Sequence, residues 1–198
     1  MDMAKEFFVF GLQKSGTKYF KKLIEENTDL KFFQDYAWKH DIDTSVCKDD
    51  NVIKFWITKS PYNWVRSVVF RSRVDILGKY RRYKLKSKDS LTVRDLNIKS
   101  LMTLYNEYHG SWVESGLENV QYEDLLKDCF PFFKDQFKLG EYKVNIPPTK
   151  NISTSKFYIE DETRQEYLST PRSNDPLIVE INRYVDHGLM EILNYRVV

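Results

Sequence analysis

The residues with the clearest chemical potential follow the first apolar run of the chain. In the segment Gly11-Leu12-Gln13-Lys14-Ser15-Gly16-Thr17, one ammonium group and two hydroxyl groups lie close together around a glycine. Glycines permit a tight backbone whose N–H groups can surround an anion, and the lysine and hydroxyl groups add further donors. The pattern predicts a phosphate-binding loop. An ordinary turn with an exposed lysine is the alternative.

The elements around this loop have the order strand, loop, helix. Glu6 to Phe10 carries a short continuous apolar run, which is typical of a strand buried on both faces of a parallel sheet. Apolar residues then recur at helical spacing from Tyr19 to Ile24, and Asn27 is expected to end that helix. The loop would therefore precede a helix N-terminus, where backbone N–H groups lack intrahelical partners and the helix dipole favours an anion.

The remaining elements alternate in the same way. Val52 to Thr58 is rich in β-branched and aromatic residues and predicts a second strand. Further predicted elements are a helix from Pro61 to about Gly78, a helix from Asn97 to Val113, a strand from Asn119 to Tyr122, a helix that starts at Leu125 with Asp124 as its cap, and a helix from Pro176 to Leu193. Strands alternating with helices predict an α/β fold with three α/β/α layers and a central parallel sheet. The length suits a single domain over residues 1–198.

Bulk composition narrows the class of protein. Lys and Arg total 31 against 29 for Asp and Glu, so the formal net charge of +2 gives no indication of a nucleic-acid partner. No apolar run approaches the ~18 residues needed to span a bilayer, and the early run lacks the flanks of a signal peptide. Cys47 and Cys129 are far apart, which predicts neither a disulfide framework nor a zinc site. We expect a soluble, reduced protein of the cytoplasm.

The order Lys14-Ser15-Gly16-Thr17 after a strand resembles a loop of the PAPS-dependent sulfotransferases, which holds the 5′-phosphosulfate of 3′-phosphoadenosine-5′-phosphosulfate (PAPS). It differs from the Walker A loop of P-loop kinases, in which lysine follows the second glycine. The resemblance is to short, bacterial-type sulfotransferase domains and implies a P-loop nucleotide-kinase-like fold. The residues that it implies for cofactor binding in this loop are Gln13, Lys14, Ser15, Gly16, Thr17 and Lys18.

A second motif of the same family follows a later strand. There a basic residue, one further residue and a proline precede a helix, and a serine stands eight positions after the basic residue. Lys59-Ser60-Pro61 and Ser67 have this spacing here. The family usually has arginine where Lys59 stands, and lysine contacts a phosphate as a point charge rather than through a bidentate fork. The resemblance implies that Lys59 and Ser67 bind the 3′-phosphate.

Two further segments set the extent of the resemblance. Tyr122-Glu123-Asp124-Leu125-Leu126 is similar to a strand-to-helix junction of many sulfotransferases, and its expected role is structural. The family's late glycine-rich loop is not recognisable, and Lys150, Ser155 and Lys156 either substitute for it or belong to a solvated polar loop. The resemblance therefore covers residues 6–126.

Transfer of a sulfuryl group to an alcohol needs a base for the acceptor proton. Histidine is the usual choice because its pKa lies near neutral pH. Family members with a catalytic histidine place it between the two motifs, often just after a lysine, and His40 lies in that interval directly after Lys39. His109 is expected to be structural, and His187 is expected to cap a helix C-terminus.

The resemblance implies three catalytic residues. Lys14 would stabilise the bridging oxygen as the S–O bond breaks, Lys39 would support the transferred sulfuryl oxygens, and His40 would take the acceptor proton. If His40 is not the base, Asp41 and Asp43 are the nearest acidic candidates in the sequence. PAPS would be the donor and adenosine 3′,5′-bisphosphate (PAP) the product, with no metal. The acceptor would be a small molecule or a glycan, and the sequence carries no signal for oligomeric state.

Two other functions remain open on the sequence. A P-loop small-molecule kinase shares the nucleotide-binding α/β architecture, although the G-K-[ST] ending of the Walker A loop and a Mg²⁺-binding arrangement are absent from the sequence. A non-catalytic nucleotide-binding module of the same fold is compatible with Lys59 in place of arginine. The basic, aromatic segment Lys79-Tyr80-Arg81-Arg82-Tyr83-Lys84 either lines an acceptor cleft or is a solvated loop.

Overall fold

A computed structural model describes residues 6–47, 51–69, 98–137, 168–169 and 173–198. The strands among them are β1 (Glu6–Phe10), β2 (Lys31–Phe32), β3 (Val52–Thr58) and β4 (Asn119–Gln121). The helices are α1 (Thr17–Asn27), α2 (Pro61–Val69), α4 (Ile98–Val113), α5 (Tyr122–Lys127), α6 (Phe130–Phe137), α8 (Pro176–Asn182) and α9 (His187–Ile192), and Thr44–Cys47 form a 3-10 helix. The four strands form one all-parallel sheet in the order β2-β1-β3-β4. The prediction of an α/β fold with a parallel sheet is confirmed.

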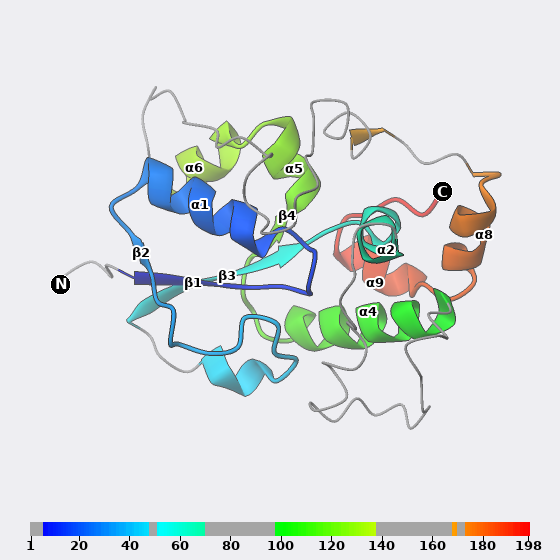
Figure 1. Cartoon of the computed structure of the whole chain (residues 1–198), viewed down its shortest axis with the longest axis horizontal. Helices are drawn as coiled ribbons and strands as arrows, with labels where there is room; N and C mark the ends of the chain where they lie inside the picture. Colours follow the sequence, from blue (N-terminus) through cyan, green and yellow to red (C-terminus); the bar gives the residue numbers. More distant parts are fainter. Residues whose placement is uncertain (1–5, 48–50, 70–97, 138–167, 170–172) are drawn as a thin grey trace.

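Helices cover both faces of the sheet. The side chains of β1 alternate between two apolar clusters, because Phe8 and Phe10 pack with residues of α2, α4, α8 and α9, whereas Phe7 and Val9 pack with residues of α1, α5 and α6. In Figure 1, α1, α5 and α6 lie on one side of the sheet and α4 lies on the other. Strand β1, predicted from its apolar run to be buried on both faces, is therefore covered by helices on both faces. The arrangement is compatible with three α/β/α layers.

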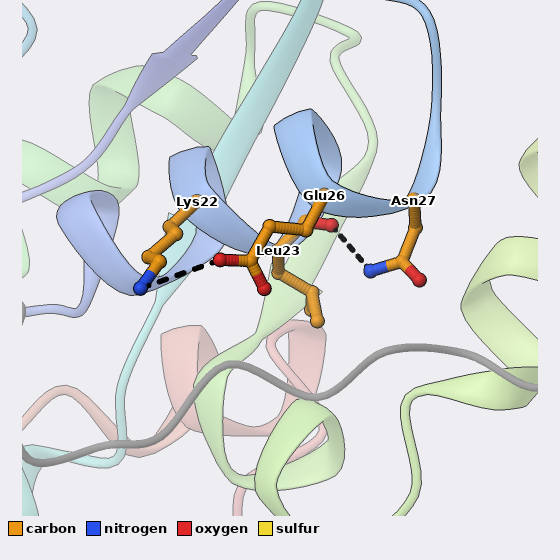
Figure 2. Close-up of polar contacts among 4 residues, drawn as sticks. All are labelled: Lys22, Leu23, Glu26 and Asn27. Carbon is orange, nitrogen blue, oxygen red and sulfur yellow. Dashed lines mark hydrogen bonds and ion pairs between the residues drawn. The ribbon is translucent and has the colours of Figure 1, made fainter.

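Helix α1 ends at the predicted residue. Leu23 lies fully buried against the sheet, and its main-chain oxygen accepts a hydrogen bond from Asn27 Nδ2 at 2.7 Å. Figure 2 shows this contact beside the ion pair that Lys22 forms with Glu26, with Nζ 3.3 Å from Oε1. The asparagine side chain thus folds back onto the last turn of the helix, and the Thr28 N–H bonds the Ile24 carbonyl at the C-cap.

Two helix boundaries differ from those predicted. Helix α5 begins at Tyr122 rather than Leu125, so Asp124 lies inside its first turn and Gln121 is the N-cap residue. The predicted helix over 176–193 is two helices, α8 and α9, because Asp186 accepts a hydrogen bond from the Leu189 N–H and starts a new helix. Aspartate here acts as an internal helix start, which the apolar periodicity alone does not reveal.

Some sequence expectations concern residues that lie outside the described ones. These are the end of the second helix near Gly78, the basic segment 79–84, and the candidates Lys150, Ser155 and Lys156. Within the described part of the chain, no helix combines the length and apolar character that a bilayer crossing requires.

Candidate functional site

The predicted phosphate loop lies at the carboxyl edge of the sheet, where β1 ends beside β3. From β1 the chain passes to β2 on one side, and from β3 it passes to β4 on the other side. The connections after this neighbouring pair therefore diverge, and open parallel sheets bind ligands at such a switch point. Gly11 follows β1 and Lys59 follows β3, so both predicted motifs start at this point.

The loop between β1 and α1 is held by its backbone. Ser15 donates to the Leu12 carbonyl through both its N–H, at 3.0 Å, and its hydroxyl, at 2.7 Å. Lys14 has φ of 73° and Gly16 has φ of 101°, so two nearby residues adopt the left-handed region. Lysine is rarely found there, and such strain is typical of ligand-binding loops.

The two glycines of the loop are required by close packing. A Cβ on Gly11 would lie 2.6 Å from Ile57 Cγ2, so the loop touches β3 without a side chain between them. A Cβ on Gly16 would lie 2.3 Å from Cδ2 of the Tyr122 ring. The loop is therefore packed on one side against β3 and on the other against the start of α5.

Lysine side chains around the loop repel one another. Burial, and then the charge of Lys18, lower the pKa of Lys14. Burial lowers the pKa of Lys39 as well, followed by the charges of Lys18 and Lys21. Across the described residues, no carboxylate forms an ion pair with Lys14, Lys18 or Lys39, and the first turn of α1 holds no acidic residue. The group is a positive cluster that a bound anion would stabilise.

Lys39 and His40, the other two residues of the implied catalytic set, both contact Gly11 of the loop. The Gly11 N–H donates to the Lys39 carbonyl at 2.9 Å, and His40 Nδ1 lies 2.5 Å from the Gly11 carbonyl oxygen. Because a carbonyl only accepts, Nδ1 carries the hydrogen and Nε2 is the basic nitrogen of the ring. His40 is 9% exposed, so the imidazole is fixed at the edge of the sheet with a defined tautomer.

Lys59 and Ser67, which the family resemblance pairs, lie close together. Lys59 Nζ is 3.4 Å from Ser67 Oγ, and Lys59 is only 4% exposed. The Lys59 carbonyl accepts a hydrogen bond from the Tyr105 hydroxyl at 2.7 Å, which fixes the main chain after β3. The Ser67 hydroxyl donates to the Asn63 carbonyl at 2.8 Å, so its single hydrogen points into α2.

The Tyr122 ring lies between the two motifs. Lys59 Nζ is 4.1 Å from the centre of this ring, and Gly16 packs directly against the ring's edge. One aromatic side chain thus separates the start of α1 from the buried ammonium group. The sequence suggested only a structural role for Tyr122, because the place of β4 beside β3 was not known.

Searches against models of protein families, curated proteins and solved structures find no match. The geometry of the site therefore carries the functional argument. That geometry consists of a strained loop, a positive cluster, an anchored imidazole and a buried lysine, all at one end of the β1–β3 pair.

Sequence reasoning missed two residues that build the site. Glu123, next to the predicted cap Asp124, accepts hydrogen bonds from the Ser60 N–H at 3.1 Å and from Asn63 Nδ2 at 2.8 Å. Trp64 Nε1 donates to the Gln13 carbonyl at 2.8 Å and ties the loop between β1 and α1 to α2. Both residues bond to segments that are far away in the sequence. Glu123 had one local signal, an acidic residue at a helix start, and Trp64 had none.

The other histidines lie away from this edge. His109 is fully buried in α4 with no hydrogen-bond partner for either ring nitrogen among the described residues, and burial lowers its pKa to about 3. His187 starts α9 instead of ending a helix, although its Nε2 lies 3.4 Å from the carbonyl of Asn182, the last residue of α8. Neither histidine approaches the loop.

The two acidic alternatives to His40 are used in turns. Asp41 Oδ1 accepts from the Asp43 N–H at 3.0 Å, and Asp43 Oδ1 accepts from the Ser45 N–H at 2.9 Å. These bonds form the approach to the 3-10 helix, and each holds a carboxylate on the local backbone. His40 differs from both, because its ring contacts the loop after β1.

Proposed function

We propose that the chain is a PAPS-dependent sulfotransferase, which moves a sulfuryl group from PAPS to a hydroxyl or amine of a small-molecule or glycan acceptor. The observation that carries the proposal is that both motifs contact the Tyr122 ring, through Gly16 after β1 and through the Lys59 ammonium group after β3. A nucleotide with phosphates at both ends of its ribose matches two separate anion sites at one sheet edge. The finer fold that we propose is the three-layer, P-loop nucleotide-kinase-like one.

The residues present fit such a ligand. Lys14 and Lys18 would hold its 5′ end at the start of α1, where the positive cluster lacks a counter-charge among the described residues. Lys59 would hold the 3′-phosphate, since its ammonium group is buried after β3 and lies 3.4 Å from Ser67 Oγ. Gly16 supports the fit because a side chain at this position would displace the Tyr122 ring between the two ends.

When bound, PAPS would supply an activated sulfuryl group. The chain's own part is positioning, proton transfer and charge stabilisation. His40 would accept the acceptor's proton at Nε2, since its Nδ1 hydrogen is held by the Gly11 carbonyl. Lys14 would stabilise negative charge that develops at the 5′ end, and Lys39, whose main chain is fixed to Gly11, would contact the oxygens of the transferred group.

Thermal unfolding with added nucleotide tests the proposal. PAP should raise the melting temperature in a concentration-dependent way, because a ligand at 100 times its Kd stabilises the native state by about 2.7 kcal/mol. ATP with Mg²⁺ is the matched comparison. A shift with ATP–Mg²⁺ alone would contradict the proposal and favour the small-molecule kinase. A PAP shift without transfer in a radiolabelled screen of carbohydrate, phenol and peptide acceptors would favour the non-catalytic nucleotide-binding module.

A further inference from the structure

The Glu123 carboxylate joins three segments around the second anion motif. Its Oε1 accepts from the Ser60 N–H at 3.1 Å and from Asn63 Nδ2 at 2.8 Å, and its Oε2 lies 3.1 Å from the Tyr195 hydroxyl. That hydroxyl also lies 3.1 Å from Thr58 Oγ1 at the end of β3. The carboxylate therefore fixes the start of α2 and the end of β3 to the start of α5.

Two routes lead from this carboxylate to the proposed 3′-phosphate donors. Along the first, Asn63 is bound to Glu123 by its side chain, and its carbonyl accepts the Ser67 hydroxyl at 2.8 Å. Ser67 Oγ in turn lies 3.4 Å from Lys59 Nζ. The second route is direct, since the bonded Ser60 N–H belongs to the residue after Lys59. One carboxylate is thus linked to both residues, and the Tyr105 hydroxyl holds the Lys59 main chain in addition.

We propose that Glu123 is a positioning residue that holds Lys59 and Ser67 in convergence on the 3′-phosphate without touching the ligand. This inference rests on the proposed function, because the ligand is taken to be a nucleotide with a 3′-phosphate. Tyr195 supports it by holding the second carboxylate oxygen. Burial and then the charge of Glu123 keep the pKa of Tyr195 well above its usual value, so the hydroxyl keeps its hydrogen.

Three variants separate positioning from folding. Glu123→Ala removes every contact, whereas Glu123→Gln keeps an oxygen for the Ser60 N–H and the Asn63 amide. Asp124→Ala is the matched control, because it removes an exposed carboxylate from the same turn of α5. The affinities of PAP and of adenosine 5′-monophosphate are measured by calorimetry, and amide hydrogen exchange over residues 60–67 is measured without ligand.

Glu123→Ala should raise the Kd of PAP about tenfold or more, since the buried Lys59 ammonium group and the Ser67 hydroxyl lose their alignment. The Kd of adenosine 5′-monophosphate should rise much less, because the hydrogen bonds of this carboxylate go to the segment after β3 and reach the loop after β1 only through Trp64 of α2. Glu123→Gln should recover most of the PAP affinity, and Asp124→Ala should change neither ligand. Equal losses for both nucleotides, or no loss for PAP, would overturn the inference.

Amide exchange distinguishes this inference from the proposed function. If the wild-type protein bound neither nucleotide, the function would be wrong, and exchange alone would decide on Glu123. Faster exchange over residues 60–67 in Glu123→Ala, but not in Asp124→Ala, would support the positioning role. Unchanged exchange in Glu123→Ala would overturn it.

Discussion

The two proposed anion motifs lie at one sheet edge but are built differently. The loop after β1 is set mainly by its main chain, with positive φ at Lys14 and Gly16 and main-chain bonds to Leu12 and Lys39, while His40 and Trp64 add one side-chain bond each. The segment after β3 is set by side chains, because Lys59 is almost fully buried within a hydrogen-bonded chain that ends at Glu123. Backbone conformation thus governs the first motif, and distant side chains govern the second.

This difference determines which substitutions matter. In the first motif, lysines are half-buried and repel each other, so removing one should change ligand binding more than folding. In the second motif, the cation is covered by an aromatic ring and its neighbours, so substitutions away from the ligand should also reach it. Substitutions in each motif therefore test whether the main chain governs the first motif and side chains govern the second.

The imidazole anchored on the first motif should carry the largest effect. His40→Ala should lower turnover roughly 10²–10⁴-fold with PAPS affinity nearly kept, because a proton-transfer group is lost. Lys14→Ala should lower both turnover and cofactor affinity, since it would contact the ligand in the ground state and the transition state. Steady-state kinetics with an acceptor from the transfer screen measures turnover and the KM for PAPS, which should differ between the two variants. Full activity in His40→Ala would remove histidine from the chemistry and return attention to Asp41 and Asp43.

The backbone character of the first motif is tested at its second glycine. Gly16→Ala should lower the free energy of unfolding by about 2–4 kcal/mol, from left-handed strain and overlap with the Tyr122 ring. Gly110→Ala is the control, because its Cβ would meet nothing within 4 Å, and it should stabilise α4 by about 0.5–1 kcal/mol. Urea denaturation measures both. Similar free energies of unfolding for the two variants would show that position 16 does not require glycine.

The side-chain character of the second motif predicts unequal roles for its donors. Lys59→Ala should weaken PAP binding by about 1.5–3 kcal/mol, the range for a lost charge-assisted hydrogen bond. Ser67→Ala should cost only about 0.5–1.5 kcal/mol, because its hydroxyl hydrogen is already donated to the Asn63 carbonyl. Calorimetric titration measures both, with adenosine 5′-monophosphate as the control ligand. A larger loss in Ser67→Ala would reverse the assignment.

The core beneath the second motif should make stability depend on pH. His109 packs against Tyr105, which holds the Lys59 main chain, and burial depresses the pKa of His109 to about 3. The unfolded chain takes up a proton below about pH 6.5 while the folded chain does not, so stability falls with falling pH by about 1.4 kcal/mol per unit. His109→Phe should lack this contribution in urea denaturation from pH 7 to 5. Identical pH slopes in both proteins would contradict the assignment.

Local patterns predicted the elements well. Strands β1 and β3 have the predicted bounds, because continuous apolar or β-branched runs suit buried parallel strands. Helix α4 ends at Val113 as predicted, its predicted start at Asn97 lies outside the described residues, and α1 ends at Asn27 as expected. Strand β2 was not predicted, since its two residues pair with β1 alone and carry too short a pattern.

The site could be predicted only where its geometry is local. Lys59 and Ser67 meet because eight positions across a strand end and a helix bring them together. Glu123 could not be placed, since its contacts with Ser60 and Asn63 span at least 60 residues and depend on the position of β4 beside β3. The sequence therefore indicated that Lys59 and Ser67 belong together but not that Glu123 lies beside them.

The most direct test of the account asks whether the two motifs share one ligand. Calorimetric titrations of the wild-type protein compare PAP with adenosine 5′-monophosphate and adenosine 3′-monophosphate. If the loop after β1 binds the 5′ end and Lys59 binds the 3′ end, PAP should bind about tenfold or more tightly than either monophosphate. Equal affinity for PAP and adenosine 5′-monophosphate would contradict the account, because Lys59 and Ser67 would then contribute nothing to the nucleotide site.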